Sequence, residues 1–119
     1  MADATTSWLR GVLELAIAAV LTESDRHGYA LAQRIEQQGL GRLRGGALYP
    51  VLGRMENAGH VTAHWQAGEG GPGRKVYRLT AAGRAWLDEN TAHWREFTLA
   101  MDGLLAHSEQ EGPRHRQDE

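Results

Sequence analysis

The 119-residue sequence predicts a mainly α-helical chain that contains one small β-hairpin. Three observations lead to this fold class. Apolar residues recur at helical spacing through the first half of the chain, alternate with polar residues between positions 61 and 79, and return to helical spacing from position 81. A repeat of about 3.6 residues indicates an amphipathic helix, whereas strict alternation indicates a half-buried strand. A chain of this length fits one domain with an appended helix.

Two helices are predicted first, over residues 8–21 and 29–38. The first is rich in Ala, Leu and Glu, which are good helix formers, and it is apolar on several faces. We therefore expect it to be buried on several faces. Ser24 and Asp25 offer a cap for the second helix, and Gly39 ends it.

A third helix is predicted over residues 47–58, beginning near Gly46. Leu48, Leu52 and Met55 form its apolar stripe at positions i, i+4 and i+7. Pro50 is tolerated because it falls in the first turn, where its missing N–H would have no partner. Three helices joined by short links match a helix-turn-helix core.

A β-hairpin is predicted next, with strands over residues 61–66 and 75–79. Val61, Ala63 and Trp65 alternate with polar residues and indicate a half-buried strand, and residues 67–73 form a tip rich in glycine. A hairpin directly after a helix-turn-helix is the wing of a winged helix-turn-helix, which presents a helix to the major groove and a basic loop to the phosphates. Residues 1–80 are therefore predicted to form a DNA-binding domain.

A long helix is predicted over residues 81–106, with Thr80 as its cap. Trp94, Phe97, Met101 and Leu104 fall at heptad-like spacing and form an apolar seam. Because such a seam needs a partner, we predict a homodimer with residues 81–107 as its dimerisation helix. Residues 108–119 contain no apolar residue and are predicted to form a disordered tail.

The net charge of −2, taken alone, argues against nucleic-acid binding. The charge is unevenly distributed, however. Residues 40–80 contain six basic and two acidic side chains and carry +4, whereas residues 1–39 carry −2 and residues 81–119 carry −4. The basic middle segment contains the predicted third helix and hairpin, so a phosphate backbone would dock there.

Neither secretion nor membrane insertion is predicted. The N-terminus lacks the basic flank, apolar run and cleavage site of a signal peptide. The apolar stretch over residues 9–21 contains Arg10 and Glu14 and is shorter than the roughly 20 residues that span a bilayer. We therefore expect a cytoplasmic protein without a membrane partner.

No catalytic, metal or cofactor site is predicted. The chain has no cysteine, which excludes disulfides and thiolate sites. Gly68, Gly70 and Gly73 match a dinucleotide-binding glycine pattern, but that pattern must open a helix and a predicted strand follows here. His60 and His64 would lie about 13 Å apart on a strand, too far to share one ion. An enzyme is a weak alternative, because no nucleophile, base and orienting group stand out together.

A set of short motifs runs through the chain in order. They are Leu9-Arg10-Gly11, His27-Gly28-Tyr29, Leu48-Tyr49-Pro50, Arg54-Met55-Glu56, Trp65, the run GRKVYRLT over residues 73–80, and Gly83. Together they resemble the PadR family of transcriptional regulators over residues 8–105. The short C-terminal part resembles the compact subfamily that includes the multidrug-sensing regulator of lactic acid bacteria. The resemblance implies a homodimeric winged-helix repressor, dimerised through its first and last helices, with double-stranded operator DNA as its partner.

The resemblance also implies DNA-binding residues. Tyr49 and Arg54 match positions of the recognition helix, and Arg74 and Lys75 match the wing. Two further candidates, Arg44 and Asn57, lie near the ends of the same helix.

Two positions depart from the family pattern. Ala47 stands where the family commonly has a hydroxyl residue, and Gly53 stands where it often has a basic or larger polar one. Each departure removes a potential DNA contact, so we expect either an operator that differs from the family's usual ones or a larger contribution of the wing to the affinity.

An interface between two copies is implied as well, and in several family members small aromatic or cationic molecules bind at the dimer centre and release the operator. The candidate residues for the interface and for such an effector are Trp8, Val12, Trp94, Phe97, Met101 and Leu104. For Trp94 two interpretations stay open: packing in the dimer, or lining a pocket for a small planar aromatic ligand. A protein-interaction module that uses the winged fold without DNA is the alternative function, favoured by the acidic net charge.

Overall fold

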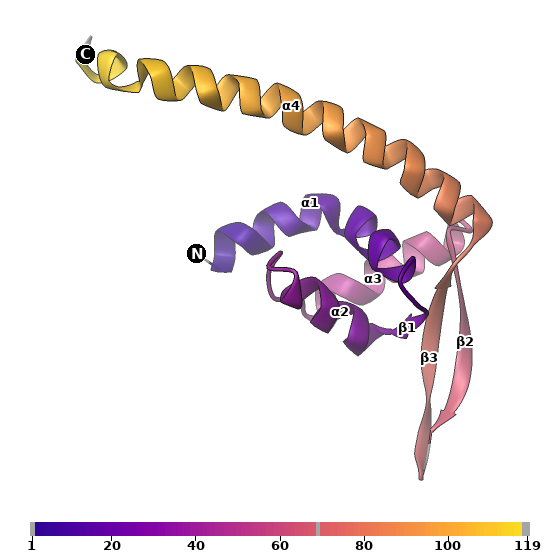
Figure 1. Ribbon diagram of the computed structural model, residues 1–119. Helices are drawn as coiled ribbons and strands as arrows, with labels where there is room; N and C mark the ends of the chain where they lie inside the picture. Colours follow the sequence, from indigo (N-terminus) through magenta and orange to yellow (C-terminus); the bar gives the residue numbers. More distant parts are fainter. Residues whose placement is uncertain (1, 69, 118–119) are drawn as a thin grey trace. The chain divides into compact units, whose positions relative to one another are not determined.

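The computed structural model describes the backbone of residues 2–68 and 70–117 and the side chains of residues 8–68 and 70–110. The elements along the chain are α1 (Ala2–Leu21), β1 (Arg26–His27), α2 (Gly28–Gln37), α3 (Gly45–Asn57), β2 (Val61–Gly68), β3 (Gly71–Leu79) and α4 (Ala81–Gln117) (Figure 1). They fall into two compact units, residues 1–88 and residues 89–119. The predicted fold class, mainly α-helical with a small hairpin, is confirmed.

The core of the first unit lies between the three helices and the helix-proximal end of the hairpin. The largest fully buried side chains come from every one of these elements: Ile17, Leu31, Ile35, Leu48, Leu52, Met55 and Val61. The stripe predicted for the third helix is therefore its core face. Burial of α1 on several faces is also confirmed, because Leu13, Ala18 and Leu21 are buried as well as Ile17.

Helix α1 differs from its prediction in two respects. It begins at Ala2 instead of at residue 8, and its backbone is non-helical at Val12, with φ −125° and ψ 15°. Gly11 precedes this position, and glycine is a poor helix former because it has the most backbone freedom to lose.

The three strands form one antiparallel sheet in the order β1-β3-β2. Strand β2 pairs with β3 from Val61 opposite Leu79 to Trp65 opposite Lys75, and the register shifts between Gln66 and Gly68. The two residues of β1 pair with Tyr77 and Val76 of β3. Strand β1 was not predicted, because two residues show no periodicity and their partners lie 50 positions away.

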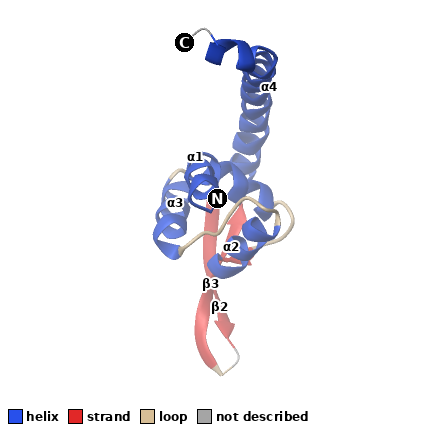
Figure 2. Cartoon of the chain, turned by 90° about the vertical axis from the view of Figure 1, so that its left-hand side faces the viewer, coloured by secondary structure: helices blue, strands red, loops and turns tan. Residues whose placement is uncertain are grey.

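The hairpin is longer than predicted. Its strands include most of the glycine-rich segment assigned to the tip, and Gly70 lies at the turn with φ +70°. Ladder hydrogen bonds use only backbone groups, so glycine can continue a strand. Trp65, predicted to be half-buried, is 72% exposed because this end of the hairpin projects beyond the helices (Figure 2).

The cap of α2 and the end of α4 also differ from the predictions. His27, not Ser24 or Asp25, caps α2 by accepting a hydrogen bond from the Ala30 N–H. Residues 108–117, predicted to belong to a disordered tail, continue α4 as far as Gln117. Glutamate and glutamine are good helix formers, so a segment without apolar residues can still be helical.

Thr80 fixes the start of α4 against the turn that follows α3. Its hydroxyl donates to the Gly59 carbonyl at 2.6 Å and accepts from the Gly83 N–H at 2.9 Å, which confirms the predicted cap. A Cβ on Gly83 would overlap the His60 carbonyl, so the close approach requires glycine. The junction ties the base of the hairpin to the end of α3.

The second unit consists of α4 beyond Asp88, a single helix. Its large apolar side chains are exposed, from 39% for Trp94 to 72% for Leu99, and the rings of Trp94 and Phe97 stack with centroids 6.1 Å apart. The helix therefore has an exposed apolar row. Within the described part of the chain, no helix combines the length and apolar character needed to cross a bilayer.

Candidate nucleic-acid interface

The outer face of α3 carries few long side chains. Opposite the buried stripe lie Gly46, Pro50, Gly53 and Asn57, spaced at i, i+4, i+7 and i+11. A Cβ placed on Gly46 or Gly53 would meet no atom within 4 Å, so both glycines face open space. We call this line the bare ridge of α3. Only Asn57 offers a side chain there that could hydrogen-bond to a base edge.

Tyr49 and Arg54 lie on the two flanks of the bare ridge. Both are exposed, Tyr49 at 52%. The Tyr49 ring lies close against the start of α2, because a Cβ on Gly28 would be 2.8 Å from two of its ring carbons. The motif His27-Gly28-Tyr29 thus leaves room for the predicted recognition tyrosine, a role that sequence analysis did not assign to Gly28.

A hollow of about 650 Å³ opens on the Tyr49 side of the ridge, between α3, the start of α2 and the hairpin. We call it the wing-side hollow. Its lining residues are His27, Gly28, Tyr29, Tyr49, Gly53, Glu56, Trp65, Arg74, Lys75 and Tyr77. Three of the six predicted DNA-binding residues, Tyr49, Arg74 and Lys75, are therefore brought together here.

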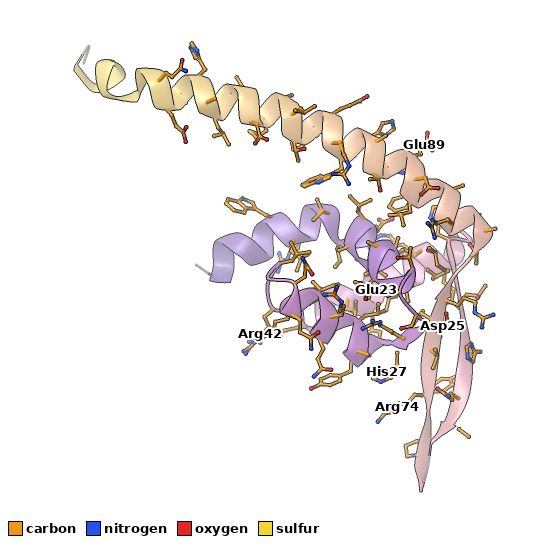
Figure 3. All side chains as sticks on the ribbon, in the orientation of Figure 1. Glu23, Asp25, His27, Arg42, Arg74 and Glu89 are labelled. Carbon is orange, nitrogen blue, oxygen red and sulfur yellow. The ribbon has the colours of Figure 1, made fainter. Side chains whose placement is uncertain are left out.

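The cations of the wing-side hollow are partly engaged. Lys75 Nζ lies 3.5 Å from Glu56 Oε1 and 5.7 Å from the centroid of the Tyr77 ring. Burial raises the pKa of the Tyr77 phenol, and the nearby Lys75 ammonium opposes that rise. Arg74 Nη1 lies 3.0 Å from His27 Nε2 (Figure 3).

Two donors, the Ala30 N–H and the Arg74 guanidinium, face the two ring nitrogens of His27. Its Nδ1 lies 3.4 Å from the Ala30 backbone nitrogen, and its Nε2 faces Arg74. A neutral imidazole has a single acceptor nitrogen, so it can accept from only one of these groups at a time. The side chain is shared between the start of α2 and the wing.

A second hollow, of about 760 Å³, opens on the Arg54 side of the ridge, between α1, the α2–α3 loop and α3. We call it the loop-side hollow. Its lining residues are Arg10, Leu13, Arg42, Leu43, Arg44, Gly46, Ala47, Pro50, Val51 and Arg54. The predicted residues Arg44 and Arg54 lie here, and Arg10 and Arg42 join them although sequence analysis did not select either one.

Other arginines of the first unit are held in ion pairs. Glu23 accepts from Arg34 at 2.9 and 3.0 Å and from Arg26 at 2.9 Å, and Asp25 accepts from Arg78 at 3.0 Å. The hydrogen bonds from Arg34 hold the pKa of Glu23 below its usual value. These pairs brace the segment before α2 and leave fewer cations free for a ligand. No three His, Asp or Glu side chains gather as a metal site in the described ranges.

A helix-turn-helix whose third helix lies beside a basic hairpin defines a winged-helix protein of the kind that binds nucleic acid. The model of the transcriptional regulator PadR-like family matches residues 17–89. The chain belongs to this family of transcriptional regulators.

Individual relatives agree with this assignment. The transcriptional regulator Rv3488 of Mycobacterium tuberculosis is 32% identical over 99 residues, which cover 83% of this chain and 91% of that protein. The structure of a PadR-like transcriptional regulator of Bacillus cereus is similar, with a TM-score of 0.73 and 29% identity. The match covers 83% of this chain and 96% of that chain. The structure of a PadR family transcriptional regulator of Eggerthella lenta has a TM-score of 0.72 at 29% identity, and the match covers 87% of this chain and 86% of that chain.

The position of His27 leads to a testable prediction. We expect His27→Ala to lower the free energy of unfolding by about 0.5–1 kcal/mol, because the start of α2 loses its side-chain acceptor. His27→Asn is the matched control, since asparagine is among the best capping residues and should preserve most of the stability. Urea unfolding followed by circular dichroism measures both. Equal stability of the two variants would contradict a capping role.

Proposed function

We propose that the protein is a homodimeric repressor that binds a pseudo-palindromic operator in the bacterial cytoplasm. The main support is the wing-side hollow, where Tyr49 of α3 and the Arg74-Lys75 pair of β3 line one surface. A helix and a basic hairpin on one surface suit a major groove and its adjoining phosphates. In the dimer, the two α3 helices would enter successive major grooves about 34 Å apart.

Base reading by this chain would depend on few side chains. The bare ridge offers Asn57, and its flanks add Tyr49 and Arg54. Arginine reads guanine with two hydrogen bonds, and asparagine reads adenine in the same way. Phosphate contacts from the wing and from Arg44 would then supply much of the affinity, and the shape of the operator would supply part of the specificity.

Dimerisation is proposed through the exposed apolar row of α4. Phe97, Met101 and Leu104 are 58%, 41% and 68% exposed, and they share one side of the helix with Trp94. A second copy would cover this seam by coiled-coil packing. Trp8 and Val12 of α1 are proposed as further interface residues; Trp8 is 76% exposed, whereas Val12 packs partly against the core.

Relief of repression by a small planar ligand at the dimer interface is the last part of the proposal. The stacked rings of Trp94 and Phe97 provide an aromatic wall for such a ligand. A protein-interaction role without DNA is the alternative, and a gel shift with the upstream region of the protein's own gene separates the two.

The wing assignment is tested by removing Arg74 and Lys75 together. Arg74→Ala combined with Lys75→Ala should weaken binding to every duplex, because phosphate contacts carry no sequence information. The plot of log affinity against log salt concentration should become shallower by about two units. The matched control removes two arginines of α4 instead, Arg84 and Arg95. Unchanged affinity of the wing variant at moderate salt would contradict the assignment.

The dimer interface is tested by placing a charge in the apolar row. Leu104→Asp should shift the protein from dimer to monomer in light scattering coupled to size exclusion, because a buried unpaired carboxylate is costly. Leu99→Asp is the control: Leu99 is 72% exposed and lies on the opposite side of the helix. A dimeric Leu104→Asp variant, or equal dissociation of both variants, would place the interface elsewhere.

The effector site is tested by tryptophan fluorescence. Planar aromatic compounds should quench part of the emission of the wild-type protein, and Trp94→Ala should abolish this quenching without loss of the dimer. Trp65→Phe serves as the control, because Trp65 is exposed on the wing and should not contribute. Quenching that persists in the Trp94 variant would indicate a ligand site that does not involve this ring.

A further inference from the structure

We propose that the loop-side hollow binds the second phosphate backbone of the operator half-site, and that Arg10 and Arg42 are phosphate-binding residues. Both side chains line this hollow together with the predicted residues Arg44 and Arg54. The inference rests on the proposed function, in which α3 enters the major groove. It extends the DNA-binding surface to α1, which sequence analysis assigned only to the core and to the dimer.

The position of α3 between two hollows carries the inference. Tyr49 and Gly53 line the wing-side hollow, whereas Ala47, Pro50 and Arg54 line the loop-side hollow. A major groove is about 12 Å wide and has a phosphate backbone along each edge, and a helix with its side chains is about 10–12 Å across. A helix lying in the groove therefore faces one backbone on each flank, and this protein offers a basic hollow on each flank.

The charge of the loop-side hollow fits a polyanion. Its lining includes four arginines and no acidic residue. Arg10, Arg44 and Arg54 have no ion pair among the side chains that the structure describes, and the nearest carboxylate to Arg42 is that of Glu36, at 3.9 Å. Four neighbouring guanidinium groups repel one another, so binding an anion relieves an existing electrostatic cost.

The surroundings of these arginines favour phosphate further. Leu13 and Val51 form a buried apolar floor, which lowers the local dielectric constant and strengthens charge-assisted hydrogen bonds at the rim. Guanidinium groups match the geometry of phosphate oxygens with paired N–H donors. The first turn of α3 has no side-chain cap, and Gly46 of that turn lines the hollow, so the positive end of the helix dipole adds to the attraction.

The test compares the salt dependence of operator binding. Arg10→Ala combined with Arg42→Ala should make the slope of log affinity against log salt about two units shallower, because two phosphate contacts are lost. The loss of affinity between about 50 and 200 mM salt should then be roughly ten-fold smaller than for the wild-type protein. The double variant Arg84→Ala with Arg95→Ala is the matched control and should keep the wild-type slope.

Two further measurements separate a direct contact from a general effect of charge or stability. Arg10→Lys with Arg42→Lys keeps both charges and should keep most of the slope, while thermal unfolding checks that the exposed alanine substitutions leave the fold intact. Operators with single neutral methylphosphonate links locate the contacts. Links that weaken binding by the wild-type protein but not by the Arg10/Arg42 variant mark the phosphates that Arg10 and Arg42 contact. The same comparison with the Arg74/Lys75 variant marks the phosphates that the wing contacts. The two sets of phosphates should lie on opposite strands.

The outcomes distinguish this inference from the proposed function. A wild-type protein that binds no duplex, including its own upstream region, would overturn both. A wild-type protein whose binding depends on Arg74 and Lys75 but not on Arg10 and Arg42 would overturn only the inference. A shallower salt slope for the Arg10/Arg42 variant, together with contacts of the two variants mapped to phosphates on opposite strands, would establish the inference.

Discussion

Antiparallel pairing of β3 with both of its neighbours is the constraint on which the candidate nucleic-acid surface depends. Its pairing with β2 builds the wing. Its pairing with β1 brings His27, the capping residue of α2, beside Arg74 of the wing. Tyr77 of the same strand packs in the core, and both Tyr77 and Lys75 line the wing-side hollow. One strand therefore sets the position of the wing relative to α2 and α3, and the junction at Thr80 fixes its far end against the turn after α3.

Pairing among the charged residues explains how an acidic protein can present a basic surface. Arg26, Arg34 and Arg78 are held by Glu23 and Asp25, on the segment between α1 and α2. The arginines of the loop-side hollow lack such close partners in the described part of the chain, the closest contact to a carboxylate being that of Arg42 with Glu36 at 3.9 Å. Net charge therefore says little about binding here, because the acids neutralise cations at structural positions and leave those beside α3 exposed.

Sequence patterns predicted the helices and the hairpin because each of these elements buries a periodic apolar face. They could not predict β1, whose two residues depend on partners 50 positions later in the chain. The candidate site divides in the same way. Tyr49, Arg54, Arg74 and Lys75 follow from local motifs, whereas Arg10 and Arg42 join the loop-side hollow only because α1 packs beside α3. His27 and Gly28 were visible as a motif, but their contacts to Arg74 and Tyr49 are tertiary.

In the proposed function, the bare ridge of α3 would leave more of the DNA contacts to the two hollows on its flanks. Glycine at positions 46 and 53 leaves open space where longer side chains would reach base edges, and it would allow the helix backbone to approach the groove floor more closely. A closer approach would bring the cations on both flanks nearer to the phosphates that border the groove. Specificity would then come from Asn57, Tyr49 and Arg54 and from how easily a sequence adopts the groove width that lets both flanks bind at once. If both hollows bind phosphate as proposed, their fixed separation across α3 would let the protein discriminate between sequences although neither hollow contacts the bases.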